Sequence, residues 1–149
     1  MKVSDALSGV SKIYFDSAPL VYYVEENPAY VGQMDAIIEQ IERATVEAFS
    51  SVILLPEVLM LPTRLGKTEL VKAYREILFN SQHFQLVAVS AEIAERATNL
   101  RAAYNLRTPD AIHVATALET GCEIFLTNDN GLKRLSEIRV LILDDVNVR

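Results

Sequence analysis

The sequence is poor in cysteine, histidine and glycine, and each shortage excludes a class of structure or mechanism. The one cysteine, Cys122, cannot form a disulfide within the chain, which is typical of a protein from a reducing compartment. The two histidines, His83 and His113, are too few and too separated to predict a transition-metal site or a histidine acid–base pair. No glycine-rich phosphate loop is present, which disfavours hydrolysis of nucleoside triphosphates.

Long hydrophobic runs are also missing. The apolar stretches are short and interrupted by charged residues, so no transmembrane helix is predicted. Residues 1–5 carry neither the apolar centre of a signal peptide nor a cleavage site. Together with the single cysteine, these features predict a cytoplasmic protein with no membrane partner.

The chain has no general excess of positive charge, because 20 acidic residues outnumber 14 basic ones and give a net charge of −6. A protein that holds long nucleic acid mainly by charge is usually basic. Basic residues do cluster locally, and we interpret these clusters either as a rim around an acidic pocket or as solvated helix faces. They lie at 64–75, 96–107 and 133–139.

Apolar residues are abundant: they make up 50% of the 149 residues, enough to bury the core of one domain spanning 1–149. Short β-prone segments alternate with segments of helical periodicity, which predicts an α/β fold with parallel strands. We expect strands at 12–15, 48–53, 84–89, 123–127 and 140–143. We expect helices from Pro19, at 30–45, a short one from Leu54, at 67–80, through Tyr104 after a cap at Ser90, and from a cap at Thr108 to Gly121. The first ten and last five residues are expected to be loosely held.

Four acidic side chains follow apolar stretches or begin helices: Asp16, Glu57, Asp110 and Asp129. In an open α/β sheet, the carboxyl ends of the strands and the adjoining helix starts converge on one crevice. Carboxylates gathered there repel one another unless they are protonated or neutralised by a cation. Because Mg²⁺ and Mn²⁺ favour such oxygen ligands, the spacing predicts a metal-dependent α/β enzyme.

Each acid also has an ordinary structural interpretation. Asp16 can cap a helix, and Asp129 can stabilise a turn. The negative charge of Asp110 can interact favourably with the positive end of a helix dipole. Glu57 lies in an apolar stretch, where a buried carboxylate needs a metal or a basic neighbour. The common position of all four acids in the α/β order favours one shared site. His113, three residues after Asp110, lies near that site or packs within its helix.

Four segments, in order, resemble motifs of the PIN-domain family, which includes the VapC-type toxin ribonucleases of VapBC toxin–antitoxin systems. They are a strand followed by Asp and Ser at 13–17, the acid Glu57 near a helix start, Pro-Asp-Ala followed by Ala-x-Ala within 107–117, and Thr-x-Asp within 125–129. The third segment is the most specific. Toxin members often carry Asn-Val-Leu after the first acid, whereas this chain has Ser-Ala-Pro-Leu at 17–20.

The resemblance implies a PIN-like three-layer α/β/α fold with a central five-stranded parallel sheet. It implies an endoribonuclease dependent on Mg²⁺ or Mn²⁺, with 5′-phosphate and 3′-hydroxyl products. The four acids would hold the metal, and Ser17, Thr127 and Asn128 would support them or position the substrate. The implied partners are an RNA substrate, an antitoxin protein and a second copy of the chain in a homodimer.

Phosphodiester cleavage needs an activated water and neutralised charge on the phosphate, and carboxylate-bound cations supply both. We expect Asp16 and Asp110 to ligate the metal directly and Asp129 to ligate it directly or through water. Glu57 is expected to orient or deprotonate the attacking water.

Two other interpretations remain open. One is a PIN-like interaction module in RNA processing, without a physiological nuclease activity of its own. The other is a phosphatase or receiver-like α/β protein, which also gathers aspartates near Mg²⁺ but needs a suitably placed lysine, and none of the lysines is persuasively placed.

Overall fold

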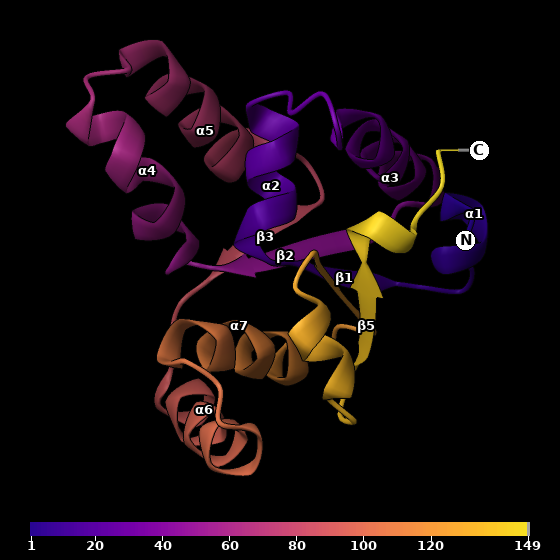
Figure 1. The fold of residues 1–149 in the computed structure, drawn as a ribbon, viewed down its shortest axis with the longest axis vertical. Coiled ribbons are helices and arrows are strands. Elements are labelled where there is room, and N and C mark those ends of the chain that lie inside the picture. The colour runs from indigo at the N-terminus through magenta and orange to yellow at the C-terminus, as the bar shows by residue number, and fades with distance from the viewer. Residues whose placement is uncertain (149) are drawn as a thin grey trace.

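A computed structural model describes residues 1–148 and shows a parallel five-stranded sheet with helices on both faces (Figure 1). The strand order is β3-β2-β1-β4-β5, and every neighbouring pair is parallel. The strands are β1 (Lys12–Phe15), β2 (Glu47–Ser51), β3 (Phe84–Val87), β4 (Ile124–Thr127) and β5 (Arg139–Ile142). The predicted three-layer α/β/α architecture with a five-stranded parallel sheet is therefore confirmed.

The helices divide into two layers. One layer contains α1 (Val3–Ala6), α2 (Ser17–Val24), α3 (Val31–Ala44), α4 (Leu54–Arg64) and α5 (Thr68–Asn80). The other contains α6 (Ala91–Tyr104) and α7 (Thr108–Glu119), which pack against each other. Two short 3₁₀ turns, η1 (Asn130–Arg134) and η2 (Leu143–Asp145), follow β4 and β5.

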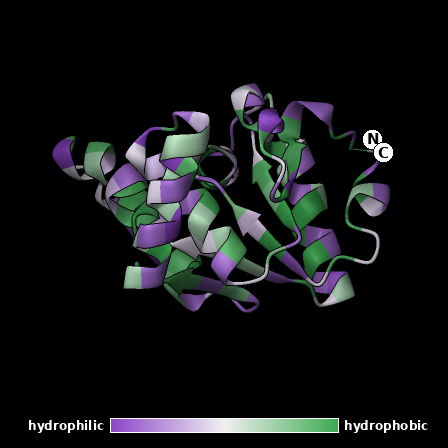
Figure 2. Ribbon diagram, turned by 90° about the horizontal axis from the view of Figure 1, so that it is seen from below, coloured by the Kyte–Doolittle hydropathy of each residue, from purple (hydrophilic) through white to green (hydrophobic). Residues whose placement is uncertain are grey.

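The central strand shows why the sheet has a core on each face. Alternate side chains of a strand point to opposite faces. Accordingly, Ile13 and Phe15 pack in the core beneath α1–α5, whereas Tyr14 packs in the core beneath α6 and α7. Tyr14 stacks on Phe125 of β4, with ring centroids 5.1 Å apart. In Figure 2, hydrophobic residues run along the visible strands, whereas the helices around them carry both hydrophobic and hydrophilic residues.

Helix α4 is longer than the short helix we expected, because it continues through Pro62 to Arg64. A proline inside a helix removes a backbone hydrogen bond. Here Leu54, Val58 and Pro62 recur every four residues and are all buried. Burial of this shared face holds the helix together across the proline.

The chain ends are held more firmly than the sequence suggested. Val3 and Ala6 of α1 are buried in the core beneath α1–α5. The amino group of Met1 donates to the carbonyl of Asp145 at 3.0 Å, and the Asn147 amide donates back to the Met1 carbonyl at 2.7 Å. The expectation of loose ends is wrong for residues 1–10 and 145–148, and Arg149 lies outside the described residues.

The carboxyl ends of the neighbouring strands β1 and β4 lie side by side in the middle of the sheet. Phe15 is paired with Leu126, so the next residues, Asp16 and Thr127, arrive together at the carboxyl edge. Within residues 1–148, no helix has the length and apolar character needed to cross a membrane.

Candidate active site

Asp16 is a buried carboxylate fixed by two strands. Its backbone N–H donates to the Leu126 carbonyl at 2.9 Å, which extends the pairing of β1 with β4 by one residue. Its Oδ1 accepts from the Ser17 backbone N–H at 2.8 Å, and its Oδ2 accepts from the Thr127 hydroxyl at 2.7 Å. Asp16 is only 9% exposed. It therefore caps α2 and at the same time stands in a fixed orientation at the sheet edge.

Burial raises the pKa of Asp16 above its usual value, since a charged group loses hydration in the interior. The negative charge of Asp110 adds to this rise. His113 and the hydrogen bond from Thr127 act in the opposite direction and lower the pKa. A cation placed beside Asp16 and Asp110 would relieve both unfavourable effects.

Glu57 lies in the first turn of α4 and contacts a histidine rather than solvent alone. Its Oε1 is 2.6 Å from Nε2 of His113, and its side chain is 29% exposed. His113, on α7, is fully buried, and its Nδ1 is 2.6 Å from the Tyr14 hydroxyl. We expected a buried Glu57 that needs a metal or a basic neighbour; Glu57 is instead exposed, although it does contact the basic residue His113.

Asp110 lies in the first turn of α7 beside Arg107. The Nε of Arg107 is 3.2 Å from Oδ2 of Asp110, whose side chain is 20% exposed, whereas that of Arg107 is 81% exposed. Asp110 raises the pKa of Arg107 most, and Asp129 and Glu57 add to the rise. One guanidinium thus lies within electrostatic reach of three of the four acids.

The start of α7 differs from the sequence prediction. We expected Thr108 to cap this helix, but Thr108 is its first residue and Arg107 occupies the cap position without a side-chain capping bond. The side chain of Arg107 pairs with Asp110 in the first turn instead of capping the helix. Pro109, which we expected at the first helical position, is therefore the second residue of the helix, and Asp110 lies in the first turn as predicted.

Asp129 follows β4 and is exposed. Its Oδ1 accepts from the Gly131 backbone N–H at 2.9 Å, and its own N–H donates to the Thr127 hydroxyl oxygen at 3.1 Å. Thr127 therefore connects Asp129 to Asp16. The Oδ1 of Asn128 accepts from the Asp144 backbone N–H at 3.1 Å, so this side chain joins the loop after β4 to η2.

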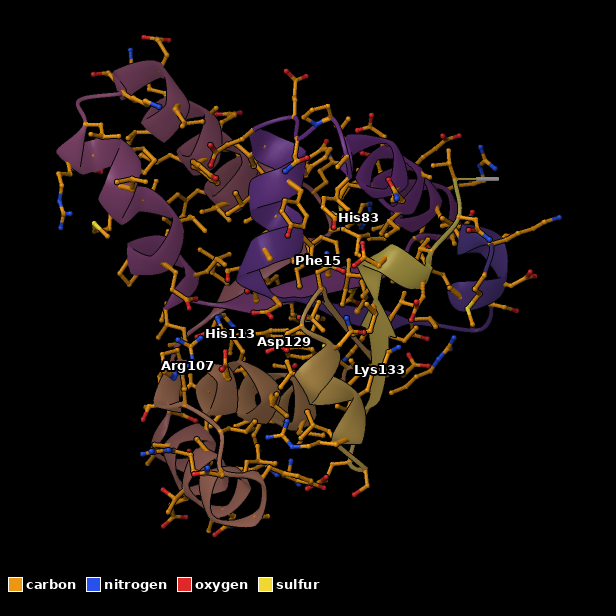
Figure 3. All side chains as sticks on the ribbon, in the orientation of Figure 1. Phe15, His83, Arg107, His113, Asp129 and Lys133 are labelled. Atoms are coloured by element: carbon orange, nitrogen blue, oxygen red, sulfur yellow. The ribbon has the colours of Figure 1, made fainter. Side chains whose placement is uncertain are left out.

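The structure places all four predicted acids around one region, between the ends of β1 and β4 and the starts of α4 and α7. Figure 3 labels Arg107, just before α7, His113, on α7, and Asp129, after β4, near this region. Among residues 1–148, no three His, Cys, Asp or Glu side chains are arranged to share a metal ion. Glu57 and Asp110 instead contact His113 and Arg107.

The contact between His113 and Glu57 is the part of the site that sequence reasoning missed. Residues three apart share one helix face, so the position of His113 after Asp110 was the available signal. That signal gave no indication that the other partner would be Glu57, 56 residues away.

These features define an α/β/α protein with acidic side chains gathered at the carboxyl edge of a parallel sheet. Residues 13–138 match the family described as the PIN domain, and this range contains all four acids. The chain belongs to the PIN domain family. A comparison with curated proteins found no match.

Several solved structures share the fold. A toxin–antitoxin complex from Klebsiella pneumoniae has 24% sequence identity and a TM-score of 0.66, covering 88% of this chain and 97% of that one. DNA-bound VapBC from Salmonella typhimurium has 16% identity and a TM-score of 0.71, with coverages of 89% and 98%. Mycobacterium tuberculosis VapC20, a toxin that cleaves the sarcin–ricin loop, has 17% identity and a TM-score of 0.61, with coverages of 85% and 98%.

Proposed function

We propose that this protein is a metal-dependent endoribonuclease that hydrolyses RNA phosphodiester bonds. In this proposal, Asp16 and Asp110 ligate Mg²⁺ or Mn²⁺ directly, Asp129 ligates it directly or through water, and Glu57 orients or deprotonates the attacking water. The observation that carries it is the environment of Asp16, a carboxylate 9% exposed, fixed by Thr127 at the edge of the sheet. A buried carboxylate with a second acid nearby is a costly arrangement that a cation makes favourable.

The donor set fits a hard divalent cation. All the candidate ligands are carboxylate oxygens, and Mg²⁺ typically keeps several waters and takes only one or two carboxylates directly. No cluster of three ligands is present among residues 1–148, and an ion bound mostly by water does not require one. When bound, such an ion supplies a water of lowered pKa and neutralises charge on the phosphate.

The surrounding residues would orient the carboxylates and bind the RNA phosphate. Thr127 keeps the Asp16 carboxylate in place, and His113 contacts Oε1 of Glu57, the carboxylate that would receive a proton from water. Arg107 is well exposed and pairs only with Asp110 in an ion pair among the described residues. Once a cation neutralises Asp110, Arg107 is available to bind a phosphate of the RNA backbone.

The biological role we propose is that of the toxin in a toxin–antitoxin pair, acting in the cytoplasm as a homodimer. Support comes from the fold shared with structures of such complexes. Further support comes from Met60 and Leu61 on α4 and Leu65 just after it, which are exposed although apolar. Leu61 and Leu65 line one surface pocket together with Glu57, so a protein that covers them would also reach this acid.

The second candidate is a PIN-domain interaction module without nuclease activity of its own. The ion pair of Arg107 with Asp110 and the hydrogen bond between His113 and Glu57 favour it, because they satisfy two acids without a metal. The two candidates differ in one outcome, which is the cleavage of RNA.

The experiment is a panel of structured and single-stranded RNAs incubated with purified protein in Mg²⁺, Mn²⁺ or EDTA. Asp16→Asn and Asp110→Asn variants, purified identically, control for contaminating nuclease. The nuclease proposal expects metal-dependent cleavage by the wild type and its loss in both variants. Equal cleavage by all three proteins identifies contamination, and no cleavage by folded, partner-free protein favours the interaction module.

A further inference from the structure

We propose that His113 is a positioning residue that holds the Glu57 carboxylate in the orientation needed for catalysis, and that Tyr14 sets the tautomer with which it does so. This inference rests on the proposed nuclease function for its kinetic consequences. Its structural part, the hydrogen-bonded order Tyr14–His113–Glu57, can be tested without any RNA.

The three residues come from three separate elements. Tyr14 is in β1, His113 is in α7 and Glu57 is in α4. The Tyr14 oxygen is 2.6 Å from Nδ1 of His113, and Nε2 of His113 is 2.6 Å from Oε1 of Glu57. The two inner members are fully buried, and only Glu57 reaches the surface. The series of hydrogen bonds therefore ends at Glu57, the acid that faces the site.

The direction of the hydrogen bonds follows from what each atom can donate. An imidazole in its neutral form has one N–H, and its tautomer is set by the bond that the other nitrogen makes. A carboxylate accepts and does not donate, so Nε2 of His113 donates its proton to Oε1 of Glu57. In the neutral imidazole Nδ1 then carries no proton and accepts from the Tyr14 hydroxyl.

A purely structural role explains less of this geometry. A helix residue in the core beneath α6 and α7 needs only an apolar side chain, and its neighbours Val114 and Ala115 are of that kind. A buried imidazole costs free energy unless both nitrogens are bonded. Here both are bonded, and the outer bond goes to an acid of the candidate site rather than to the backbone.

Two substitutions distinguish the contribution of Nε2 of His113 from that of Nδ1. In His113→Gln the amide can occupy the position of Nε2 and donate to Glu57, whereas in His113→Asn the shorter amide lies near the position of Nδ1 and does not reach Glu57. We expect His113→Asn to lower kcat by about 10- to 100-fold with little change in KM, the usual range for residues that orient the ligands of a metal site. We expect His113→Gln to recover most of this loss.

Tyr14→Phe keeps the ring that stacks on Phe125 and removes only the hydroxyl. It should lower kcat less than His113→Asn, because the imidazole remains but populates both tautomers. His83→Asn is the matched control, since His83 is the second histidine, is exposed and lies at the start of β3. Thermal unfolding of each variant establishes that it is folded.

The tautomer is measured by two-dimensional ¹⁵N–¹H spectra of the imidazole rings at pH 8.5, and His83→Asn leaves a single histidine to assign. The proposal expects the Nε2–H form of His113 in the wild type and a mixture in Tyr14→Phe. The Nδ1–H form in the wild type would overturn it. So would equal kcat values in the wild type and His113→Asn, or an equal loss in the Asn and Gln variants.

Failure of the nuclease function and failure of the positioning role of His113 give different results. If folded wild-type protein cleaves no RNA while the Nε2–H tautomer is present, the proposed function fails and the ordered contact with Glu57 stands. If cleavage is metal-dependent but the Asn and Gln variants behave alike, the nuclease function stands and the positioning role fails.

Discussion

The hydroxyl of Thr127 donates to Oδ2 of Asp16 across the junction of β4 and β1, over 2.7 Å. Both side chains are buried, and they come from positions 111 residues apart in the sequence. The parallel pairing of the two strands places them at the same edge, so the sheet itself determines the orientation of this carboxylate.

Removing that hydroxyl is the first prediction. Thr127→Val keeps the shape of the side chain but leaves a buried oxygen of Asp16 without its donor, which typically costs about 1–3 kcal/mol. We expect a loss of stability of this size in urea unfolding and a lower kcat for RNA cleavage. Thr127→Ser restores the hydroxyl and should behave nearly as the wild type. If valine matched serine in both measurements, the hydrogen bond would have no functional role.

The raised pKa of Asp16 predicts a conflict between stability and function. Burial makes the folded state bind a proton at Asp16 more tightly than the unfolded state does. As the pH rises from the ordinary aspartate value through the raised pKa, the unfolded chain loses its proton first and the folded state loses relative stability. Above the raised pKa, ionised Asp16 destabilises the fold.

Asp16→Asn removes that charge and keeps one oxygen, which can accept from Thr127 while the bond from the Ser17 N–H is lost, so the gain in stability is partly offset. We therefore expect it to be more stable than the wild type at pH 7.5 by about 0.5–2 kcal/mol, the usual range for a stabilising substitution. The difference should shrink at acid pH, where Asp16 of the wild type is protonated. The measurement is urea unfolding at both pH values, and a less stable variant at pH 7.5 would contradict the account.

Added metal should make the wild type more stable than Asp16→Asn. A ligand that binds only the folded state stabilises it by about 2.7 kcal/mol when its concentration is 100 times Kd. We expect Mg²⁺ or Mn²⁺ to raise the melting temperature of the wild type and EDTA to reverse the change. Asp16→Asn should respond much less. Equal responses of the two proteins would place any bound metal away from Asp16.

Arg107 is predicted to exchange partners during the reaction. Arg107→Gln removes the cation that competes for Asp110, so Mg²⁺ should bind more tightly in calorimetry. The same substitution removes a phosphate contact, and we expect KM for RNA to rise about tenfold, equivalent to about 1.4 kcal/mol. It should also weaken the dependence of RNA binding on salt. Arg107→Lys keeps the charge and serves as the control; if it matched the glutamine variant, charge would not be the cause.

The arrangement of strands and the positions of the acids could be predicted because they depend on local patterns. An apolar run that ends at an acid identifies Asp16 and Asp129, and a proline in the first turn identifies the helix of Asp110. In a parallel sheet, these local features determine which edge the side chains occupy. The order of the strands then brings them together.

The partners of the acids could not be predicted, because they depend on how helices distant in sequence pack. Glu57 and His113 meet because α4 begins just after β2 and α7 packs against β2. The chain ends were misjudged for the same reason, since Met1 and Asn147 bond across the whole length of the sequence. No periodicity or local propensity encodes such contacts.

The most direct test of the central claim is the chemistry of the ends that cleavage leaves. An end-labelled RNA is cut by the wild type in Mn²⁺, with Asp110→Asn as the control, and the new termini are identified by mass spectrometry. The account predicts 5′-phosphate and 3′-hydroxyl ends that appear only with wild-type protein and metal, because an activated water attacks the phosphorus. Ends bearing a 2′,3′-cyclic phosphate, or cleavage that persists in EDTA, would contradict it.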